Sequence, residues 1–475
     1  MQQVPKREQG MFGQITATMG SSYTLHTPQA FRDALRRGAT RVFHPSKAGP
    51  FFLNLPINTQ PAKVTLRLDS LPERPQPFVP YLLNDTLIKN AAALISQASQ
   101  IAIKAGGGSR KAAKALHRFA ETSGAVVVLS PGSTGVVPDD HPQNMHVGGS
   151  KGSISGNYAM QEAELVIFVG SRGVCQSDCS GIGWPKAKHV ININIDFNDV
   201  LHYNNTLALQ GDAATILEQL TQCLDKQKNK SEWLLKCLTK KKEWQAFKKE
   251  RFEAATIEDD IWGIPLLTQP QVIKIADDFA RLHGAIKFFD AGDVQANGFQ
   301  IVEDERPNRT FTDTGASYMG FAASSLLASG MADNPEYAIA LCGDGSFLMN
   351  PQILIDAVEH RVHGMIVILD NRRMGAITGL QEAQYGHEFA TNDSVVVDYV
   401  TLCNSVTGVR AFPGGTHRET LIEALEKAHQ HQGLSVVHLP VYFGPHEMGN
   451  LGAWGQWNVG NWCQEVQKEH QRLGL

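Results

Sequence analysis

Two apolar runs in the C-terminal half of the chain each end in a short polar motif, and this pairing constrains the fold more than any other feature. Residues 337–341 lead through a cysteine into Gly-Asp-Gly-Ser at 343–346. Residues 365–369 form the second run, which stops at Asp370 and Asn371. Short apolar runs bounded by turn residues predict buried strands.

The segment between the two runs predicts a helix. Asn350 is typical of an N-cap and Pro351 fits the first helical position, so we expect a helix that continues to His360 and ends at Gly364. A strand–helix–strand unit forms a parallel pair. Both motifs are therefore expected at the carboxyl ends of neighbouring strands, where α/β sheets bind their ligands.

These motifs contain side chains that suit Mg²⁺. Asp344 offers a carboxylate oxygen, Asn371 an amide oxygen, and the carbonyl of Arg373 is a third candidate ligand. Mg²⁺ prefers such oxygens together with phosphate oxygens and water. Gly343 and Gly345 allow the backbone to approach a phosphate closely. Each turn is common by itself, so the prediction rests on their joint placement.

The paired motifs resemble the signature of thiamine diphosphate enzymes. The resemblance extends upstream to Ser-Tyr-Met-Gly-Phe-Ala at 317–322 and to Phe-Phe-Asp-Ala-Gly-Asp at 288–293, and it is to the acetolactate synthase-like superfamily. It implies that Met319 lies beneath the cofactor and enforces its bent shape, for which a polarizable thioether is suited. An ordinary core methionine is the alternative for Met319.

The resemblance also implies a set of site residues. Met319 is the catalytic candidate, and the Mg²⁺ ligands are Asp344, Asn371 and the Arg373 carbonyl. The cofactor-binding residues are Gly292, Asp293, Met319, Gly343, Asp344, Gly345, Ser346, Asn371 and Gly375. Cys342, next to this set, is interpreted as a buried strand residue rather than a nucleophile.

The middle of the chain, residues 84–225, alternates predicted strands and helices, which indicates a doubly wound α/β domain. It resembles the central domain of the same family, in which some members bind FAD or a nucleotide. Gly-rich strand ends at 106–108 and 170–172 fit such a ligand, but tight turns require the same glycines. We therefore regard a flavin or nucleotide as the less favoured interpretation.

Residues 226–267 form a basic segment, interpreted as a linker helix. Trp233, Cys237, Trp244 and Phe247 recur at helical spacing and predict an apolar stripe, with the lysines facing water. Residues 268–475 then form the diphosphate-binding domain. This gives an α/β fold with doubly wound parallel sheets in a central and a C-terminal domain.

Residues 1–60 resemble only the end of the family's pyrimidine-binding domain, which supplies the glutamate that activates the cofactor. Glu8 is the one acid among the first thirty residues, and we do not assign that role to it. Three explanations stay open: a shortened gene product, one half of a split enzyme, or a relative that binds the cofactor without catalysis.

Composition limits the possible partners. The net charge of −4 argues against nucleic acid, and no apolar run is long enough to span a membrane. The 7 cysteines lack metal-type spacing and suggest a reducing compartment, so we expect a cytoplasmic protein. The family resemblance implies a homo-oligomer, a dimer or tetramer, or a partner chain that supplies the pyrimidine-binding domain.

The segment 374–382 is similar to a loop of trihydroxycyclohexanedione hydrolases, the group that this chain resembles most. This similarity favours hydrolytic C–C cleavage of a cyclic 1,2-dione, a small-molecule carbonyl substrate, with Gln381 and Glu382 as contacts. The alternatives are an acetolactate synthase-like carboligase, a 2-oxo acid decarboxylase, and a non-catalytic cofactor-binding subunit. Trp454, Trp457 and Trp462 could cover the substrate or pack on a neighbouring subunit.

Overall fold

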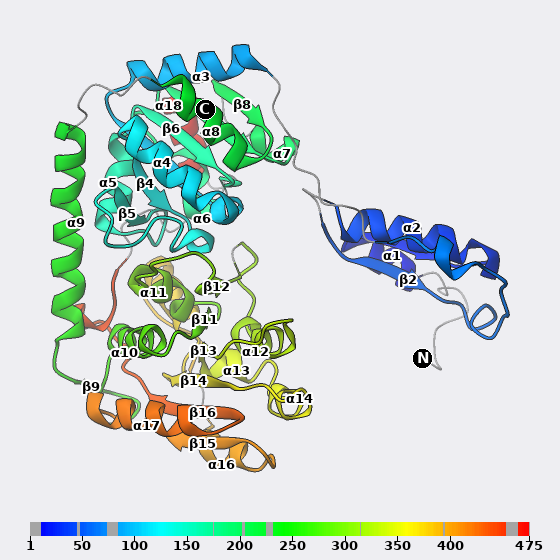
Figure 1. Cartoon of the computed structure of the whole chain (residues 1–475). Helices are drawn as coiled ribbons and strands as arrows, with labels where there is room; N and C mark the ends of the chain where they lie inside the picture. Colours follow the sequence, from blue (N-terminus) through cyan, green and yellow to red (C-terminus); the bar gives the residue numbers. More distant parts are fainter. Residues whose placement is uncertain are drawn as a thin grey trace. The chain divides into compact units, whose positions relative to one another are not determined.

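The computed structural model describes residues 11–44, 48–73, 84–173, 175–201, 205–224, 231–313, 315–392, 395–452 and 464–474. The three C-terminal tryptophans singled out in the sequence therefore lie outside the described residues. The chain divides into two compact units, Met1–Leu82 and Leu83–Leu475 (Figure 1).

The first unit contains two parallel strands and two helices. The strands β1 (Ser21–Thr24) and β2 (Phe51–Asn54) pair with Ser21 opposite Phe51. Helix α2 (Phe31–Val42) connects them, and α1 (Met11–Thr18) precedes β1. Two parallel strands joined by a helix form a βαβ unit.

The second unit begins with a six-stranded sheet in the order β5-β4-β3-β6-β7-β8, in which every described pair is parallel. Its strands are β3 (Ile101–Ala105), β4 (Val126–Leu129), β5 (Asn144–Val147), β6 (Leu165–Val169), β7 (His189–Asn194) and β8 (Thr206–Gln210). Its helices are α3 (Asp85–Gln97), α4 (Ala113–Ser123), α5 (Ile154–Glu162), α6 (Cys175–Asp178), α7 (Phe197–Val200) and α8 (Ala213–Cys223). Every residue of β3 to β6 is buried, as expected for a sheet with both faces covered.

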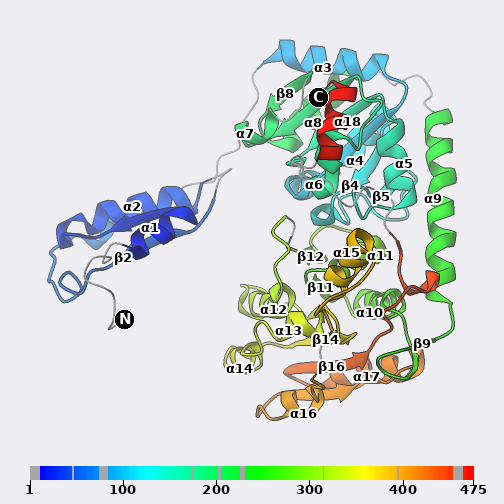
Figure 2. The ribbon, with the colours of Figure 1, turned by 180° about the vertical axis from the view of Figure 1, so that it is seen from behind.

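A second six-stranded sheet follows, in the order β12-β11-β13-β14-β16-β15, again parallel throughout (Figures 1 and 2). Its strands are β11 (Ile286–Phe289), β12 (Thr310–Thr312), β13 (Ala338–Gly343), β14 (Gly364–Asp370), β15 (Arg410–Pro413) and β16 (Leu434–Pro440). Its helices are α10 (Gln269–Leu282), α11 (Asp293–Ile301), α12 (Phe321–Met331), α13 (Asp344–Phe347), α14 (Ile353–Glu359), α15 (Gly375–Tyr385), α16 (Tyr399–Asn404) and α17 (Arg418–Gln430). The α/β class with doubly wound parallel sheets is confirmed.

Two smaller elements complete the second unit. The short strands β9 (Ile257–Asp259) and β10 (Ile264–Leu266) form an antiparallel pair ahead of α10. Helix α18 (Gln464–Leu473) returns to the central domain, where Val466 packs against Cys179 and Ile182. Within the described residues, no helix combines the length and the hydrophobicity that a membrane crossing needs.

Two sequence-based expectations about the C-terminal domain are wrong in detail. Helix α14 starts at Ile353 with Gln352 as its N-cap, not at Asn350. The amide of Asn350 instead donates to Ser324 Oγ of α12 at 2.9 Å, so a tertiary contact replaces the cap. The segment after Asn371 is also not a loop, because α15 begins at Gly375.

Helix α9 (Ser231–Phe252) joins the two domains of the second unit (Figure 2). Trp233 belongs to the core of the central domain and Trp244 to the core of the C-terminal domain. The expectation that the lysines face water is wrong for Lys241 and Lys248, which are buried. The Lys241 ammonium donates to the carbonyl of His141 at 3.0 Å, so it satisfies backbone of the central domain.

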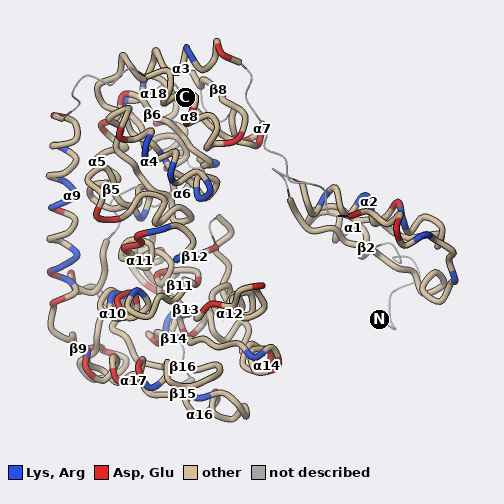
Figure 3. Tube along the Cα trace, in the orientation of Figure 1, with Lys and Arg blue, Asp and Glu red and all other residues tan. Residues whose placement is uncertain are grey.

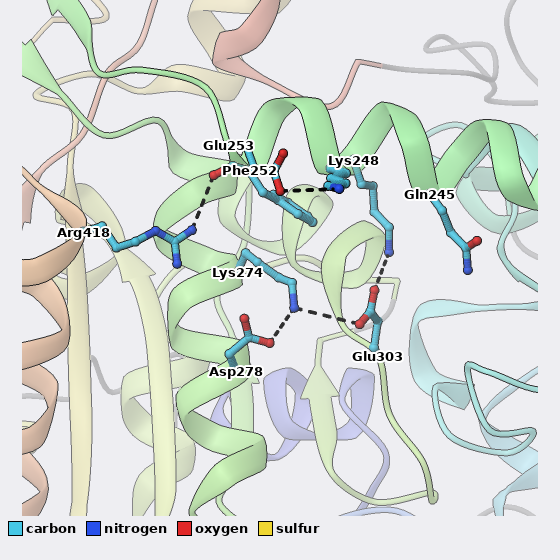
Figure 4. Close-up of a pocket in the computed structure, with 9 residues that line it drawn as sticks. Gln245, Lys248, Phe252, Glu253, Lys274, Asp278, Glu303 and Arg418 are labelled. Carbon is cyan, nitrogen blue, oxygen red and sulfur yellow. Dashed lines mark hydrogen bonds and ion pairs between the residues drawn. The ribbon is translucent and has the colours of Figure 1, made fainter.

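Charged residues fasten the end of α9 to α10 and α17 (Figure 4). Lys248 pairs with Glu303 at 3.0 Å, and Lys274 pairs with Asp278 at 2.5 Å and with Glu303 at 3.9 Å. Arg418 donates to the carbonyl of the last residue of α9 at 3.4 Å. These pairs surround a cavity of about 320 Å³. Because charges of both signs are paired within its wall, we interpret this region as structural.

Candidate functional site

The strand register brings three polar segments to one edge of the C-terminal sheet. β13 lies between β11 and β14, with Phe289 opposite Leu341 and Gly343 opposite Leu369. The chain therefore leaves all three strands on the same side, as parallel pairing requires. Figure 3 shows the basic and acidic residues along the trace.

Asp344 and Asn371 follow neighbouring strands at this edge. Both are nearly buried, at 3% and 8% exposure. The Asn371 side-chain oxygen accepts a hydrogen bond from the Arg373 backbone N–H at 3.0 Å. Asp370 accepts from the Arg372 backbone N–H at 3.0 Å and pairs with His438 Nε2 at 2.9 Å, so the turn after β14 is held from two sides. Carboxylate and amide oxygens on adjacent strand ends fit a magnesium ion, which binds hard oxygen ligands.

Met319 lies beside the Gly-Asp-Gly turn. A β-carbon built on Gly345 would be 3.3 Å from Met319 Cε and 3.3 Å from Met374 Sδ. The ends of the two methionine side chains therefore lie next to Gly345, and a larger residue there would require them to shift by a few tenths of an ångström. Met374 was not singled out in the sequence; its position directly after the Asp370–Arg373 turn was the available signal.

Asp290 explains why the segment with Met319 lies there. Its carboxylate accepts hydrogen bonds from the backbone N–H groups of Gly320 at 2.9 Å and Ala322 at 2.8 Å. Burial raises the pKa of Asp290, and these N–H groups, together with the Ser346 side chain, oppose that rise. Ser346 is thus engaged with a protein carboxylate, which the sequence did not predict.

A cavity of about 410 Å³ lies next to the Asn371 turn. Four predicted site residues line it, namely Asp293, Asn371, Arg373 and Gly375. The predicted Gly343, Asp344, Gly345 and Ser346 lie at the end of β13 and in α13, and the predicted Met319 precedes α12; none of them is part of this wall. Gly292 precedes α11 with a φ of 80°, a left-handed conformation that favours glycine.

Gly375 allows α11 and α15 to approach one another. A β-carbon at Gly375 would be 2.8 Å from Asp293 Oδ2 and 3.1 Å from Asn371 Nδ2. Asp293 and Asn371 are therefore neighbours across this glycine. Burial raises the pKa of Asp293, and the charge of Lys151 opposes that rise.

Lys151 enters the cavity from the central domain. Burial lowers its pKa to about 8, and the charge of Asp293 opposes that fall. For both residues, therefore, loss of solvent outweighs their mutual attraction. Lys151 was missed in the sequence; a lysine within the glycine-rich segment 148–152 was the only local signal.

The two proposed substrate contacts on α15 separate in the structure. Glu382 lines the cavity and is exposed. The side chain of Gln381 accepts a hydrogen bond from the Phe389 backbone N–H at 2.7 Å and donates one to the Phe389 carbonyl at 3.3 Å. Gln381 is not part of the cavity wall. Tyr442 and Phe443, which follow β16, add aromatic surface to the wall and were also missed.

The glycine-rich turns of the central domain contact each other. The Gly106 N–H donates to the Val169 carbonyl at 2.9 Å, and the Gly108 N–H donates to the Gly170 carbonyl at 3.0 Å. A β-carbon on Gly106 would be 2.4 Å from the Gly170 carbonyl oxygen. Close packing of the two turns thus accounts for Gly106 without a flavin or nucleotide.

Two family models match this chain. "Thiamine pyrophosphate enzyme, central domain" matches residues 88–220, and "Thiamine pyrophosphate enzyme, C-terminal TPP binding domain" matches residues 290–439. Together they cover more than half of the sequence, and the second contains all three polar strand ends. The chain therefore belongs to the thiamine pyrophosphate enzyme family, whose cofactor is also called thiamine diphosphate.

Curated relatives agree with this membership at low identity. A 3D-(3,5/4)-trihydroxycyclohexane-1,2-dione hydrolase of Halalkalibacterium halodurans is 26% identical over 467 residues, which span 91% of this chain and 71% of the relative. A probable acetolactate synthase large subunit of Methanocaldococcus jannaschii is 28% identical over 397 residues, 81% of this chain and 64% of the relative. Acetolactate synthase isozyme 1 large subunit of Escherichia coli is 25% identical, and the match covers 60% of that chain.

Proposed function

We propose that this protein binds thiamine diphosphate with Mg²⁺ at the carboxyl edge of the C-terminal sheet and breaks a C–C bond next to a carbonyl group. The observation that carries the proposal is the placement of Asp344 and Asn371 on neighbouring strand ends. When bound, the cofactor supplies an electron sink for the carbanion that such a cleavage creates.

The protein's own residues would hold and orient the reactants. Asp344 and Asn371, with the Arg373 carbonyl, are the proposed Mg²⁺ ligands. Backbone N–H groups at the starts of α11 and α15 favour an anionic diphosphate, because helix N-termini carry a partial positive charge. Met319 and Met374, which flank Gly345, would restrict the space available to the rings of the cofactor.

Two substrate classes have specific support. The segment that becomes α15 and the hydrolase relative favour a cyclic 1,2-dione. The acetolactate synthase relatives and the two cationic side chains in the cavity wall, Lys151 and Arg373, favour a 2-oxo acid. We place the dione first, as hydrolytic ring cleavage, and the 2-oxo acid second, as carboligation or decarboxylation.

An activity comparison tests this ranking. Protein loaded with thiamine diphosphate and Mg²⁺ is offered a cyclic 1,2-dione and pyruvate under the same conditions. We expect a higher kcat/KM for the dione, measured by loss of the dione absorbance and by carbon dioxide release from pyruvate. The reverse order would support the 2-oxo acid reaction, and turnover of neither would contradict both.

We also propose that the active form is a homo-oligomer. Large apolar side chains stay exposed on the C-terminal domain, including Ile355 at 59%, Leu380 at 48%, Tyr385 at 67% and Phe389 at 78%. Exposed apolar surface of this kind is typical of a subunit contact. Light scattering on the cofactor-loaded protein measures the mass, and a single-chain mass would contradict the proposal.

A further inference from the structure

The turn that carries Asn371 and Arg373 has an unusual backbone. Arg372, which lies between them, has a φ of 52°, in the left-handed region that is costly for a residue with a β-carbon. Such a conformation persists only where its surroundings hold it. The Asp370 carboxylate provides one such contact, because its Oδ1 accepts a hydrogen bond from the Arg372 N–H at 3.0 Å. The orientation of Asp370 therefore bears on both proposed metal ligands of this turn.

His438 holds the other oxygen of the Asp370 carboxylate. Its Nε2 is 2.9 Å from Asp370 Oδ2, the length of a good hydrogen bond to a carboxylate. The strand register explains this contact, because His438 of β16 lies opposite Ile368 of β14. Side chains alternate between the two faces of a sheet, so His438 points to the same face as Asp370, two residues after Ile368. Each oxygen of the carboxylate thus has its own donor, one from the turn and one from the neighbouring strand.

Aromatic contacts continue from His438 to the turn that begins at Asp344. Tyr399, the first residue of α16, packs on the His438 ring with 4.9 Å between the ring centroids. Tyr399 also meets Phe347 edge-on, with 5.9 Å between the centroids. Phe347 is the last residue of helix α13, whose first residue is Asp344. Because Tyr399 and Phe347 are buried in the same core, a continuous chain of packed groups joins the two turns.

The relative positions of the two turns matter more for Mg²⁺ than for other hard cations. Mg²⁺ demands near-ideal octahedral geometry with bonds of about 2.0–2.1 Å, whereas Ca²⁺ accepts longer bonds and varied geometry. Groups that orient metal ligands without touching the metal commonly contribute about 10- to 100-fold to metal affinity. A chain of contacts that fixes both turns would therefore favour Mg²⁺ over Ca²⁺.

We propose that His438 is a positioning residue of the Mg²⁺ site. It holds the turn of Asn371 through its hydrogen bond to Asp370. Through its ring contact with Tyr399, it ties this turn to the one that begins at Asp344. The inference rests on the proposed function and deepens it, because it assigns the metal preference of the site to residues that do not bind the metal.

The test compares two metals, Mg²⁺ and Ca²⁺, by calorimetric titration of each into protein that holds excess thiamine diphosphate. We expect His438→Leu to bind Mg²⁺ about 10- to 100-fold more weakly than wild type, and Ca²⁺ within about threefold of wild type. His438→Gln, whose side-chain amide can still donate to Asp370, should keep its Mg²⁺ affinity within about threefold. The ratio of the two metal affinities is the readout that a merely structural role of His438 would not change.

Further variants separate metal geometry from stability. His360→Leu, at an exposed position after α14, is the matched control and should bind both metals as wild type does. Urea unfolding without metal and cofactor measures the stability of each variant independently. If His438→Leu does not fold, His438→Asn takes its place and should show the same loss, because its shorter side chain leaves the position of Nε2 empty. Tyr399→Leu should lower the Mg²⁺ preference in the same direction, and an unchanged preference would overturn the link to the Asp344 turn.

The outcomes distinguish this inference from the proposed function. Equal weakening of Mg²⁺ and Ca²⁺ binding in His438→Leu would show a structural role alone and overturn the inference. Unchanged Mg²⁺ affinity in that variant, or an equally large loss in His438→Gln, would also overturn it. In each of these cases the proposed function stands, because the wild-type protein still binds the cofactor with metal. If wild-type protein shows no metal-dependent binding of thiamine diphosphate, the proposed function fails and this inference fails with it.

Discussion

At the scale of single residues, His146 connects the two domains of the second unit and is buried where they meet. It lies in β5, and its Nε2 is 3.2 Å from the carbonyl oxygen of Val302, just after α11. Burial lowers the pKa of His146 from 6.5 to about 3, and the nearby Lys248 adds to this. A neutral ring that donates from Nε2 satisfies this contact, whereas a protonated ring would carry a buried charge.

This contact predicts acid sensitivity. The pKa of His146 is lower in the folded protein than in the unfolded chain, so the unfolded chain binds more protons as the pH falls. The contribution of His146 to the free energy of unfolding is therefore fully present above pH 6.5 and is lost as the pH falls toward about 3. At pH 5.5 the loss from His146 is about 1.4 kcal/mol. Urea unfolding of wild type and His146→Asn, an exchange that tolerates its φ of 65°, should show a weaker pH dependence in the variant. Identical slopes would contradict this interpretation.

The sequence predicted the position of a residue well where that residue follows a strand directly, while the roles of these residues stay predictions. Asp344 and Asn371 could be placed together because parallel register fixes strand ends. Lys151 could not, because its position in the cavity depends on how the central domain packs on α11. Lys241 and Lys248 were assigned to water for a related reason: helical periodicity does not reveal that a long side chain reaches backbone carbonyls or Glu303 in another element.

At the scale of elements, two turns of the central domain pack more closely than a side chain would permit. The turn after β3 presses Gly106 against Gly170 and Ser171, whose Cα atom would be 2.5 Å from a β-carbon on Gly106. Gly107, the next residue, has only the Gly132 carbonyl at 3.6 Å, an ordinary contact. Adjacent glycines in one turn therefore differ sharply in what they tolerate.

This difference predicts that two neighbouring alanine substitutions will differ in their effect on stability. Gly106→Ala should destabilise the protein by about 1–3 kcal/mol, because the two turns must separate. Gly107→Ala should stay within about 0.5 kcal/mol of wild type. Denaturant unfolding of both variants measures the difference. A Gly106→Ala protein as stable as Gly107→Ala would show that the turns do not pack as described.

Sequence patterns predicted most strands well but located helix starts poorly. β13 and β14 lie on the two apolar runs predicted as strands, residues 337–341 and 365–369, because short apolar runs bounded by turn residues mark buried strands. The start of α14 was misplaced because Asn350 bonds to α12 instead of capping. Segment 374–382 was taken for a loop because its glycines, Gly375 and Gly379, mask a helix that begins beside the Asn371 turn.

At the scale of the whole molecule, the second unit combines two α/β domains across one cavity. Helix α9 contributes a tryptophan to each domain core, and the Gln300–Gly152 bond joins α11 to the central domain. The C-terminal domain supplies the proposed metal and diphosphate ligands, and the central domain supplies Lys151. The domain order was predictable from alternating strands and helices, whereas the cavity between the domains was not.

The most direct test of the central claim is calorimetric titration of the purified chain with thiamine diphosphate, in Mg²⁺ and in EDTA, for wild type and Asp344→Ala. We expect wild type to bind the cofactor at least about tenfold more tightly with Mg²⁺, because metal ligation links the diphosphate to Asp344 and Asn371. Asp344→Ala should lose that metal dependence, while Asp356→Ala on α14, a carboxylate outside the site, should retain it. Equal Mg²⁺-dependent binding by wild type and Asp344→Ala, or no binding by wild type, would contradict the account.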